Sequence, residues 1–207
     1  MGKVSAGATM SLDGYIAGPH DTGFDMLFKW YGAGDVEVPM PDATAGVPAS
    51  RVAPESAELM RREFGDLGAL VVGRHLYDLT NGWGGRHPLD VTTVVLTHRP
   101  PEDRPVADDN FVFVTEGIEA AVARAKEIAG ERDVAVNGGQ MARQALEAGL
   151  LDEIGVDLVP VLLGVGTRLI ADPALPPMEL EGPILVVEGV GVTHLRYRVK
   201  PRHDSGP

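Results

Sequence analysis

Short runs of apolar residues alternate with stretches of helical periodicity through the middle of this chain. The run Ala69–Gly73 (ALVVG) is continuously apolar, which is typical of a strand covered on both faces of its sheet. Similar runs occur at five other places and predict strands there. They are Lys3–Met10, Val91–Thr97, Phe111–Thr115, Val134–Val136 and Ile154–Leu163, the last interrupted by Pro160.

The segments between these runs have the spacing of amphipathic helices. From Glu116 to Ala129 apolar residues recur every three or four positions, and Gly130 can end the helix. Shorter helices are predicted to begin at Pro54 and to cover His75–Leu79 and Met141–Ala148. Because strands and helices alternate, the central sheet should be mostly parallel.

The two ends of the chain differ from its middle. Ile184–Glu188 and Val192–Lys200 flank a Gly-Val-Gly turn and predict an antiparallel hairpin, which makes the sheet mixed. Gly18 to Pro54 is long and shows little periodicity, so we expect an irregular loop with a function, such as a lid over a site. Residues 1–200 should form a single domain and residues 201–207 a disordered tail.

Composition narrows the possible partners. The chain has 207 residues, a net charge of −12 and no cysteine. This charge disfavours nucleic acid and anionic membranes, and the lack of cysteine excludes disulfides and thiolate chemistry. The six histidines are dispersed, so no metal site is expected. No apolar run is long enough for a signal peptide or a membrane span, which predicts a cytoplasmic protein.

Candidate chemistry lies where three predicted strands end. Gly73-Arg74-His75 and Thr97-His98-Arg99 each place potential cations after a strand, and Asn137-Gly138-Gly139-Gln140 joins a strand to a helix. In parallel α/β sheets ligands bind at the carboxyl ends of the strands. A guanidinium and a helix N-terminus both suit a phosphate group. Taken singly, Arg74 is better explained as a surface ion-pair partner and His98-Arg99 as a solvated loop, and the glycine stretch is as compatible with a plain turn as with a ligand. Together the three stretches favour a phosphate-containing ligand.

Several longer stretches resemble the dihydrofolate reductase superfamily. They are VVGRHLYD, VVLTHR, VNGGQMARQALEAGLLDEIGVDLVPVLLGVGTRLI and, near the start, ATMSLDGYIAG. The third is most similar to the branch that contains the reductase domain of bifunctional riboflavin-biosynthesis enzymes. The resemblance implies a three-layer α/β fold with a central sheet of about eight strands. It also implies that NADPH binds across the carboxyl edge of that sheet.

The resemblance assigns cofactor contacts residue by residue. Arg74, Thr97, His98 and Arg99 would surround the adenosine 2′-phosphate. The pyrophosphate would lie against the turns that follow two strands, formed by Gly73, Arg74, His75, Asn137, Gly138, Gly139, Gln140 and Met141. The nicotinamide would lie against Ala8 and Thr9, with Ile16 and Gly18 closing over it. In the related reductases the glycine turn contains a cis peptide, so the bond Asn137–Gly138 is expected to be cis.

The substrate is less constrained than the cofactor. The resemblance implies hydride transfer to a C=N or C=O of a small heterocyclic or ribose-derived substrate, as in 5-amino-6-(5-phosphoribosylamino)uracil reductases. Asp13 is the candidate for orienting or protonating the substrate, although it could instead shape its loop through backbone N–H groups. Trp30 is a candidate wall of the substrate pocket, with core filling as the alternative.

Two other functions remain open, and we also expect a homodimer. No carboxylate in the region of Ser56 to Glu58 clearly matches the one that binds pterin in dihydrofolate reductases, which disfavours folate. A pterin reductase and a non-catalytic NADPH-binding sensor are nevertheless the two alternatives.

Overall fold

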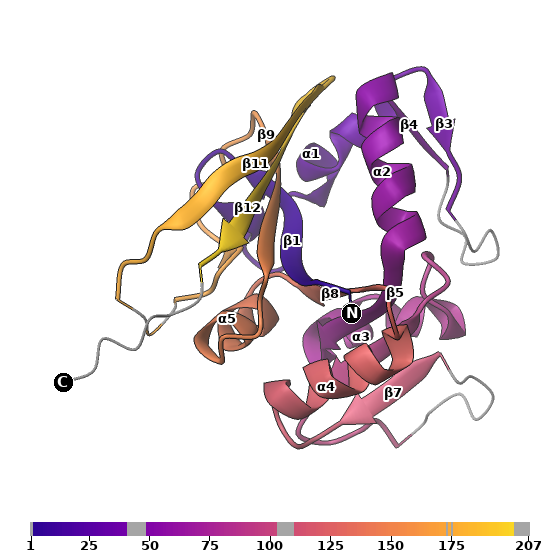
Figure 1. The fold of residues 1–207 in the computed structure, drawn as a ribbon. Coiled ribbons are helices and arrows are strands. Elements are labelled where there is room, and N and C mark those ends of the chain that lie inside the picture. Colours follow the sequence, from indigo (N-terminus) through magenta and orange to yellow (C-terminus); the bar gives the residue numbers. More distant parts are fainter. Residues whose placement is uncertain (1, 41–48, 103–109, 173, 175, 201–207) are drawn as a thin grey trace.

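An eight-stranded sheet forms the centre of the computed structural model, which describes residues 2–40, 49–102, 110–172, 174 and 176–200. Its strand order is β11-β12-β9-β1-β8-β5-β6-β7 (Figure 1). The strands are β1 Val4–Ser11, β5 Leu67–Gly73, β6 Thr92–Leu96, β7 Phe111–Val114, β8 Asp133–Asn137, β9 Glu153–Val159, β11 Leu180–Gly189 and β12 Val192–Val199.

Strand directions confirm the predicted mixed sheet. β9, β1, β8, β5, β6 and β7 are mutually parallel, as expected for strands joined by helical crossovers. β12 pairs antiparallel with β9, and β11 pairs antiparallel with β12, which forms the C-terminal hairpin. All the carboxyl ends of the parallel strands therefore lie along one edge.

Helices α4 (Ile118–Ala129) and α5 (Gln140–Glu147) cover one face of the sheet. The apolar positions of α4 face inward, since Ala121, Val122 and Ala125 are all buried. They pack with Val71 of β5 and with the neighbouring parallel strands in the largest core cluster. Burial of this stripe, rather than helix propensity alone, holds α4 in place.

The opposite face is covered in two parts. Val72, the neighbour of Val71 on β5, points the other way and packs with Tyr77 of helix α3 (Arg74–Leu79). Helix α2 (Pro54–Asp66) covers the end of the sheet that contains β9, β12 and β11. The result is the three-layer α/β arrangement that the sequence predicted.

The segment between Gly18 and Pro54 is more ordered than predicted. It contains helix α1, a 3₁₀ helix and short strands, whose bounds are β2 Tyr15–Ala17, α1 Phe24–Leu27, η1 Lys29–Gly32, β3 Val36–Val38 and β4 Ser50–Val52. Leu27 and Trp30 are 0% and 3% exposed and pack with Val159 and Val192 of the sheet. The prediction of an irregular loop is therefore wrong for these residues, because contacts distant in sequence supply the segment with its own core.

Two other expectations differ from the structure or lie outside it. β9 ends at Val159, immediately before Pro160, because proline has no N–H to continue the ladder. The predicted strand from Ile154 to Leu163 is thus too long. The predicted tail at 201–207 lies outside the described residues. Within those that are described, no helix is both long and apolar enough to cross a bilayer.

Candidate functional site: a cleft along the carboxyl edge of the sheet

A cleft of about 1270 Å³ follows the carboxyl ends of the parallel strands. Its floor comes from β1, β8, β5 and β6, with loop residues beyond β7 at one end. Helix α3 forms one wall, and residues between β2 and η1 form another. The volume exceeds the range of ~300–1,000 Å³ that is usual for drug-sized ligands, so the cleft has room for an elongated molecule.

The structure brings almost all the predicted cofactor residues together in this cleft. Those that line it are Ala8, Thr9, Ile16, Gly73, Arg74, His75, Thr97, His98, Arg99, Asn137, Gly138, Gly139, Gln140 and Met141. Gly18 is the exception: its N–H donates to the carbonyl of Thr22 at 2.8 Å and it shapes the turn beside the cleft. These residues meet because the chain returns to one edge after each helix.

Arg74 is oriented by two neighbours. Its Nε donates to both carboxylate oxygens of Asp78, one turn further along α3, at 2.7 and 2.9 Å. Its Nη1 donates to the carbonyl of Arg99 at 2.7 Å. Nη2 makes no hydrogen bond within the described residues, so one edge of the guanidinium is available to an anion. Asp78 both fixes this side chain and places a negative charge beside the candidate phosphate site.

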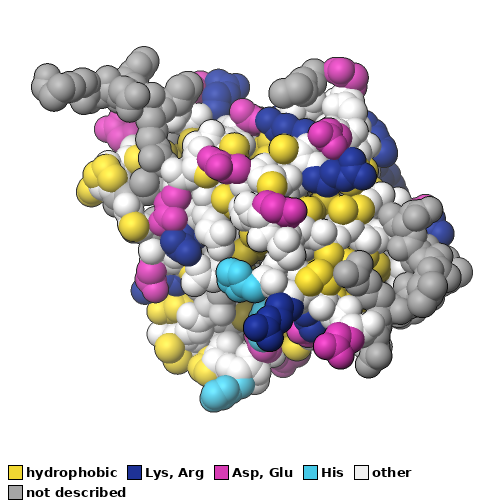
Figure 2. All heavy atoms as spheres, turned by 90° about the horizontal axis from the view of Figure 1, so that it is seen from below, with side chains coloured by type: hydrophobic (Ala, Val, Ile, Leu, Met, Phe, Trp, Pro, Cys, Tyr) yellow, Lys and Arg dark blue, Asp and Glu magenta, His cyan; other side chains and the backbone are white. Residues whose placement is uncertain are grey.

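The end of β6 carries the other basic groups. The Thr97 hydroxyl donates to the carbonyl of Arg99 at 2.9 Å, which closes a tight turn and exposes His98 and Arg99. His75, on α3, contacts the carboxylate of Asp21 at 2.9 Å and so links two walls of the cleft. On the face shown in Figure 2, acidic and basic groups are interspersed, and histidine and basic side chains lie next to each other.

The turn after β8 depends on close packing at its glycines. A Cβ at Gly138 would lie 2.7 Å from Cδ1 of Ile16, and Gly139 has a φ of 74°. Neither α3 nor α5 has a side-chain cap on its first N–H groups, which leaves these donors for a ligand. The predicted cis bond is wrong: among the described residues only Gly182–Pro183 is cis, so Asn137–Gly138 is trans.

Asp13 lies outside the cleft lining. Its carboxylate accepts hydrogen bonds from the Ser11 hydroxyl at 2.6 Å and from the N–H groups of Leu163 and Gly164 at 3.1 and 2.6 Å. The hydrogen bond from Ser11, together with those from the two backbone groups, holds the pKa of Asp13 below its usual value. In this position the carboxylate joins two loops and does not line the cleft.

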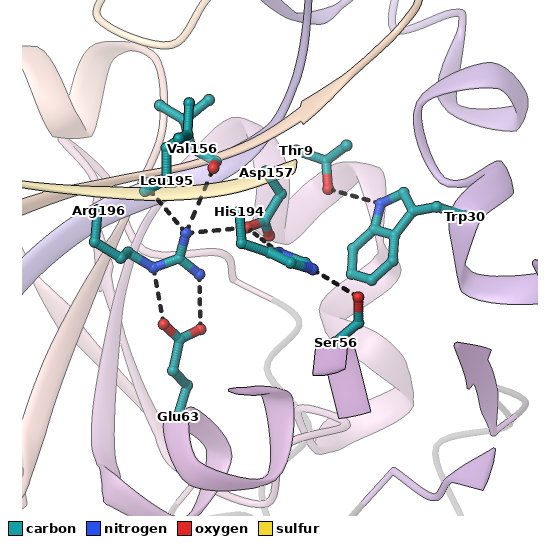
Figure 3. Close-up of polar contacts among 9 residues, drawn as sticks. All are labelled: Thr9, Trp30, Ser56, Glu63, Val156, Asp157, His194, Leu195 and Arg196. Carbon is teal, nitrogen blue, oxygen red and sulfur yellow. Dashed lines mark hydrogen bonds and ion pairs between the residues drawn. The ribbon is translucent and has the colours of Figure 1, made fainter. Parts of the chain in front are cut away.

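Trp30 is also outside the cleft lining. It is 3% exposed, its Nε1 donates to Thr9 Oγ1 at 3.4 Å, and its ring lies edge-on to His194 (Figure 3). Tyr31 stacks on it with ring centroids 4.1 Å apart. Burial and the charges of Asp157 and Glu63 raise the pKa of Tyr31. The aromatic pair therefore fills the space behind Thr9 as part of a second core, the cluster that also contains Leu27, Val159 and Val192.

A buried polar network, which the sequence did not suggest, lies behind this aromatic pair (Figure 3). His194 contacts the Ser56 hydroxyl at 2.9 Å through Nε2 and Asp157 at 2.8 Å through Nδ1. Arg196 also donates to Asp157, at 3.0 Å, and binds the carboxylate of Glu63 with two hydrogen bonds. Although burial tends to raise the pKa of Asp157, hydrogen bonding from His194 and the charge of Arg196 hold it below its usual value.

The chain of contacts from Ser56 through His194 to Asp157 matches the arrangement of a nucleophilic triad. The burial of Ser56 and His194 excludes that role in this conformation. Ser56 and His194 are both 1% exposed, and neither lines the cleft. A nucleophile must reach its substrate, so this network instead ties α2 to β9 and β12. A histidine, a serine and an aspartate distant in sequence gave no spacing signal that could have predicted it.

Sequence reasoning missed several apolar residues of the cleft wall. Phe24 and Phe28 line it from α1 and the residue that follows, and Leu76 and Leu79 line it from α3. The four-residue spacing of the two phenylalanines is a helical signal, since it places both rings on one side of a short helix.

Comparison with known proteins now places the chain in a family. A sequence model of the RibD C-terminal domain matches residues 2–190, so the chain belongs to that family. A search of curated proteins gave no match.

Solved structures share the fold. A protein from Shewanella sp. PV-4 assigned to riboflavin biosynthesis is 23% identical over 96% of this chain and 99% of its own, with a TM-score of 0.67. RibD of Acinetobacter baumannii is 14% identical over 96% of this chain and 58% of its own, with a TM-score of 0.59. A pyrimidine reductase-like protein of Corynebacterium diphtheriae is 15% identical over 96% and 92%, with a TM-score of 0.59.

Proposed function

We propose that this protein is an NADPH-dependent reductase that transfers hydride to a C=N or C=O of a small heterocyclic or ribose-derived substrate. Its activity would be similar to that of 5-amino-6-(5-phosphoribosylamino)uracil reductases. The observation that carries this proposal is the single cleft in which basic side chains after β5 and β6 share a floor with the glycine turn after β8. The two structural relatives named for riboflavin biosynthesis and pyrimidine reduction support it.

The residues present fit the proposed cofactor. The guanidinium groups of Arg74 and Arg99 supply the positive charge that a 2′-phosphate requires, and His98 lies beside them in the cleft lining. The uncapped N–H groups after Gly73 and Gly139 suit a pyrophosphate. Close contact between Gly138 and Ile16 leaves no space for a side chain there, which keeps this part of the floor open. When bound, NADPH would supply the hydride.

The chain's own contribution is positioning and exclusion of water. Ala8 and Thr9 would form the floor beneath the reacting groups, with Ile16 against one side. The Thr9 hydroxyl, 5% exposed, accepts a hydrogen bond from Trp30 Nε1 behind the floor, which fixes the floor at this end. Phe24 and Phe28 exclude water from the same end.

A non-catalytic NADPH-binding module is the second candidate. The position of Asp13 favours it, because the carboxylate is used in joining loops and does not line the cleft. A pterin reductase is the third. The decrease in NADPH absorbance with a panel of pterin, pyrimidine and quinone-like substrates distinguishes these candidates. Turnover of any substrate excludes a non-catalytic binding module.

Cofactor choice provides the first prediction. NADPH should bind more tightly than NADH, and Arg74→Ala should weaken NADPH binding by about 1.5–3 kcal/mol, the range for one lost charge-assisted hydrogen bond. NADH affinity should change little. Calorimetric titration of both cofactors measures this.

The matched control is Arg124→Ala on α4, which also removes an arginine paired with an acidic residue on its own helix, but one that does not line the cleft. It should leave both affinities unchanged. Equal affinities for the two cofactors in the unmodified protein would remove the 2′-phosphate assignment.

A further inference from the structure

We propose that the substrate end of the cleft accepts a flat, uncharged ring conjugated to the C=O or C=N group, and not a phosphorylated substrate. This inference rests on the proposed reductase function and narrows its substrate class. It follows from how charge and aromatic side chains are distributed along the cleft.

The basic side chains that line the cleft come from the turns after two neighbouring strands. Arg74 and His75 follow β5, and His98 and Arg99 follow β6. In the sheet these strands are the second and third neighbours of β1. Adjacent strands are ~4.8 Å apart, so the backbones of β5 and β6 lie roughly 10–14 Å from β1, which carries Ala8 and Thr9.

The other end offers nothing that binds an anion strongly. Its described lining residues are Ala8, Thr9, Ile16, Ala17, Asp21, Phe24, Phe28 and Thr167, which pairs with Ala17, and none of them is a cation. The single charged residue in this set is the acidic Asp21, which contacts His75. A phosphate placed here would lose its hydration without gaining a charged partner, in a protein that already carries a net charge of −12.

Two aromatic rings form a surface at this end instead. Phe24 and Phe28 stack nearly parallel, with centroids 5.8 Å apart and an angle of 9° between the ring planes. Phe28 is 41% exposed although it lies within a cleft. A large exposed aromatic side chain in a cleft is typical of a surface that a ligand covers.

The aromatic surface rests on a rigid support. Leu27, between the two rings in sequence, is 0% exposed, and Trp30 is anchored in the second core through Thr9 and His194. Leu79 of α3, 47% exposed, faces the same cleft from the other wall. The substrate end is therefore a mainly apolar slot, whose polar lining residues are Thr9, Asp21 and Thr167.

The reaction in such a slot is a balanced two-electron reduction. The carbon of the C=O or C=N gains a hydride from NADPH, and the electron pair of its π bond moves to the oxygen or nitrogen. That atom takes up a proton from solvent, and NADPH becomes NADP⁺.

The test compares matched substrates that differ in one charged group. One pair is 1,4-naphthoquinone and its 2-sulfonate; the other is 5-amino-6-(5-phosphoribosylamino)uracil and its dephosphorylated riboside. We expect kcat/KM for the uncharged member to be at least tenfold higher within a pair. A higher value for the charged member of both pairs would overturn the proposal.

Variants connect this preference to the aromatic surface. Phe28→Ala should lower kcat/KM for the uncharged ring at least tenfold and leave the Kd for NADPH unchanged. Met26→Ala is the control, because Met26 is 45% exposed on α1, two residues before Phe28, but does not line the cleft. Lys29 is the basic residue next to Phe28 in sequence. A preference for the charged member that disappears in Lys29→Ala would assign the anion to Lys29 and overturn the proposal.

Binding measurements separate this inference from the proposed function. If no substrate is turned over, each member of the two pairs can be titrated by calorimetry into the protein with NADPH. The dissociation constants of the charged and uncharged members are then compared in place of kcat/KM. Tighter binding of the charged member then overturns the inference. Failure of NADPH to bind overturns the proposed function. Titration of the same pairs without cofactor then still tests whether the apolar slot prefers the uncharged member.

Discussion

His87 shows how burial sets the charge of a single residue. Burial lowers the pKa of His87 to about 4 from an ordinary value of 6.5. Its Nδ1 accepts a hydrogen bond from the N–H of Leu89 at 3.2 Å, and its ring lies edge-on to Trp83. A protonated Nδ1 could not accept that bond, so the fold selects the neutral imidazole.

A pH dependence of stability follows. Between pH 6.5 and about 4 the unfolded chain binds a proton that the folded chain does not. The contribution of neutral His87 to the stability of the folded state is therefore complete above pH 6.5 and is lost as the pH falls toward 4. We expect the free energy of unfolding in urea to decrease by about 2–3 kcal/mol from His87 alone between pH 7 and pH 4.5.

His87→Gln isolates this contribution. The variant should show a flatter decrease over the same pH range, with Trp83 fluorescence as a local probe of unfolding. An identical pH profile in variant and parent would show that His87 titrates normally.

The Ser56–His194 contact gives a second residue-scale prediction. Because both side chains are buried, Ser56→Ala leaves His194 Nε2 without this partner and should lower the free energy of unfolding by about 1–3 kcal/mol. The affinity for NADPH should not change, because Ser56 does not line the cleft. Urea unfolding and cofactor titration of the same variant measure both. Loss of NADPH affinity in a variant of unchanged stability would contradict the structural role.

At the scale of elements, the sequence predicted those features that depend on residues close together in the chain. Continuous apolar runs marked the parallel strands, and the cations after β5 and β6 could be assigned to one site because parallel strands end at a common edge. Asp13 could not be placed in this way. Its partners Leu163 and Gly164 are 150 and 151 residues away, so its role depends on the fold and not on its neighbours in sequence.

The same distinction explains the segment after Gly18. Its apolar residues lack a clear period because each short element buries only one or two of them. Leu27 and Trp30 pack against Val159 and Val192, which follow more than a hundred residues later. No local pattern could reveal that the segment is a folded wall of the cleft.

The turn after β8 provides the prediction at this scale. In Gly138→Ala the new methyl group would lie 2.7 Å from Ile16, so Ile16 must move into the cleft or the turn must shift. We expect a loss of stability of about 1–3 kcal/mol and weaker NADPH binding. Gly65→Ala in α2 is the control, because a Cβ there meets nothing within 4 Å and alanine favours the helix. Unimpaired cofactor binding by Gly138→Ala would show that this contact does not shape the site.

At the scale of the whole molecule, the C-terminal hairpin has an apolar face that the described residues leave open. Val186 of β11 is 53% exposed and pairs with Leu195 of β12, so both side chains share one face. Ile184, two residues before Val186, is on the same face and 39% exposed. We propose that a second copy of the chain covers this face, because a two-fold contact buries the apolar patch of both copies at once.

This proposal predicts a homodimer whose strength depends on salt. Each copy carries a net charge of −12, so the two repel each other, and higher ionic strength should strengthen association by screening that repulsion. Val186→Lys should convert the dimer to monomer in light scattering after size exclusion. Glu188→Lys is the matched control, because it places a lysine two residues further along the same face, where a charged side chain is already exposed. That variant should remain dimeric and, by reducing the negative charge, associate more tightly at low salt. A parent protein that is monomeric at every salt concentration would refute a dimer at this face.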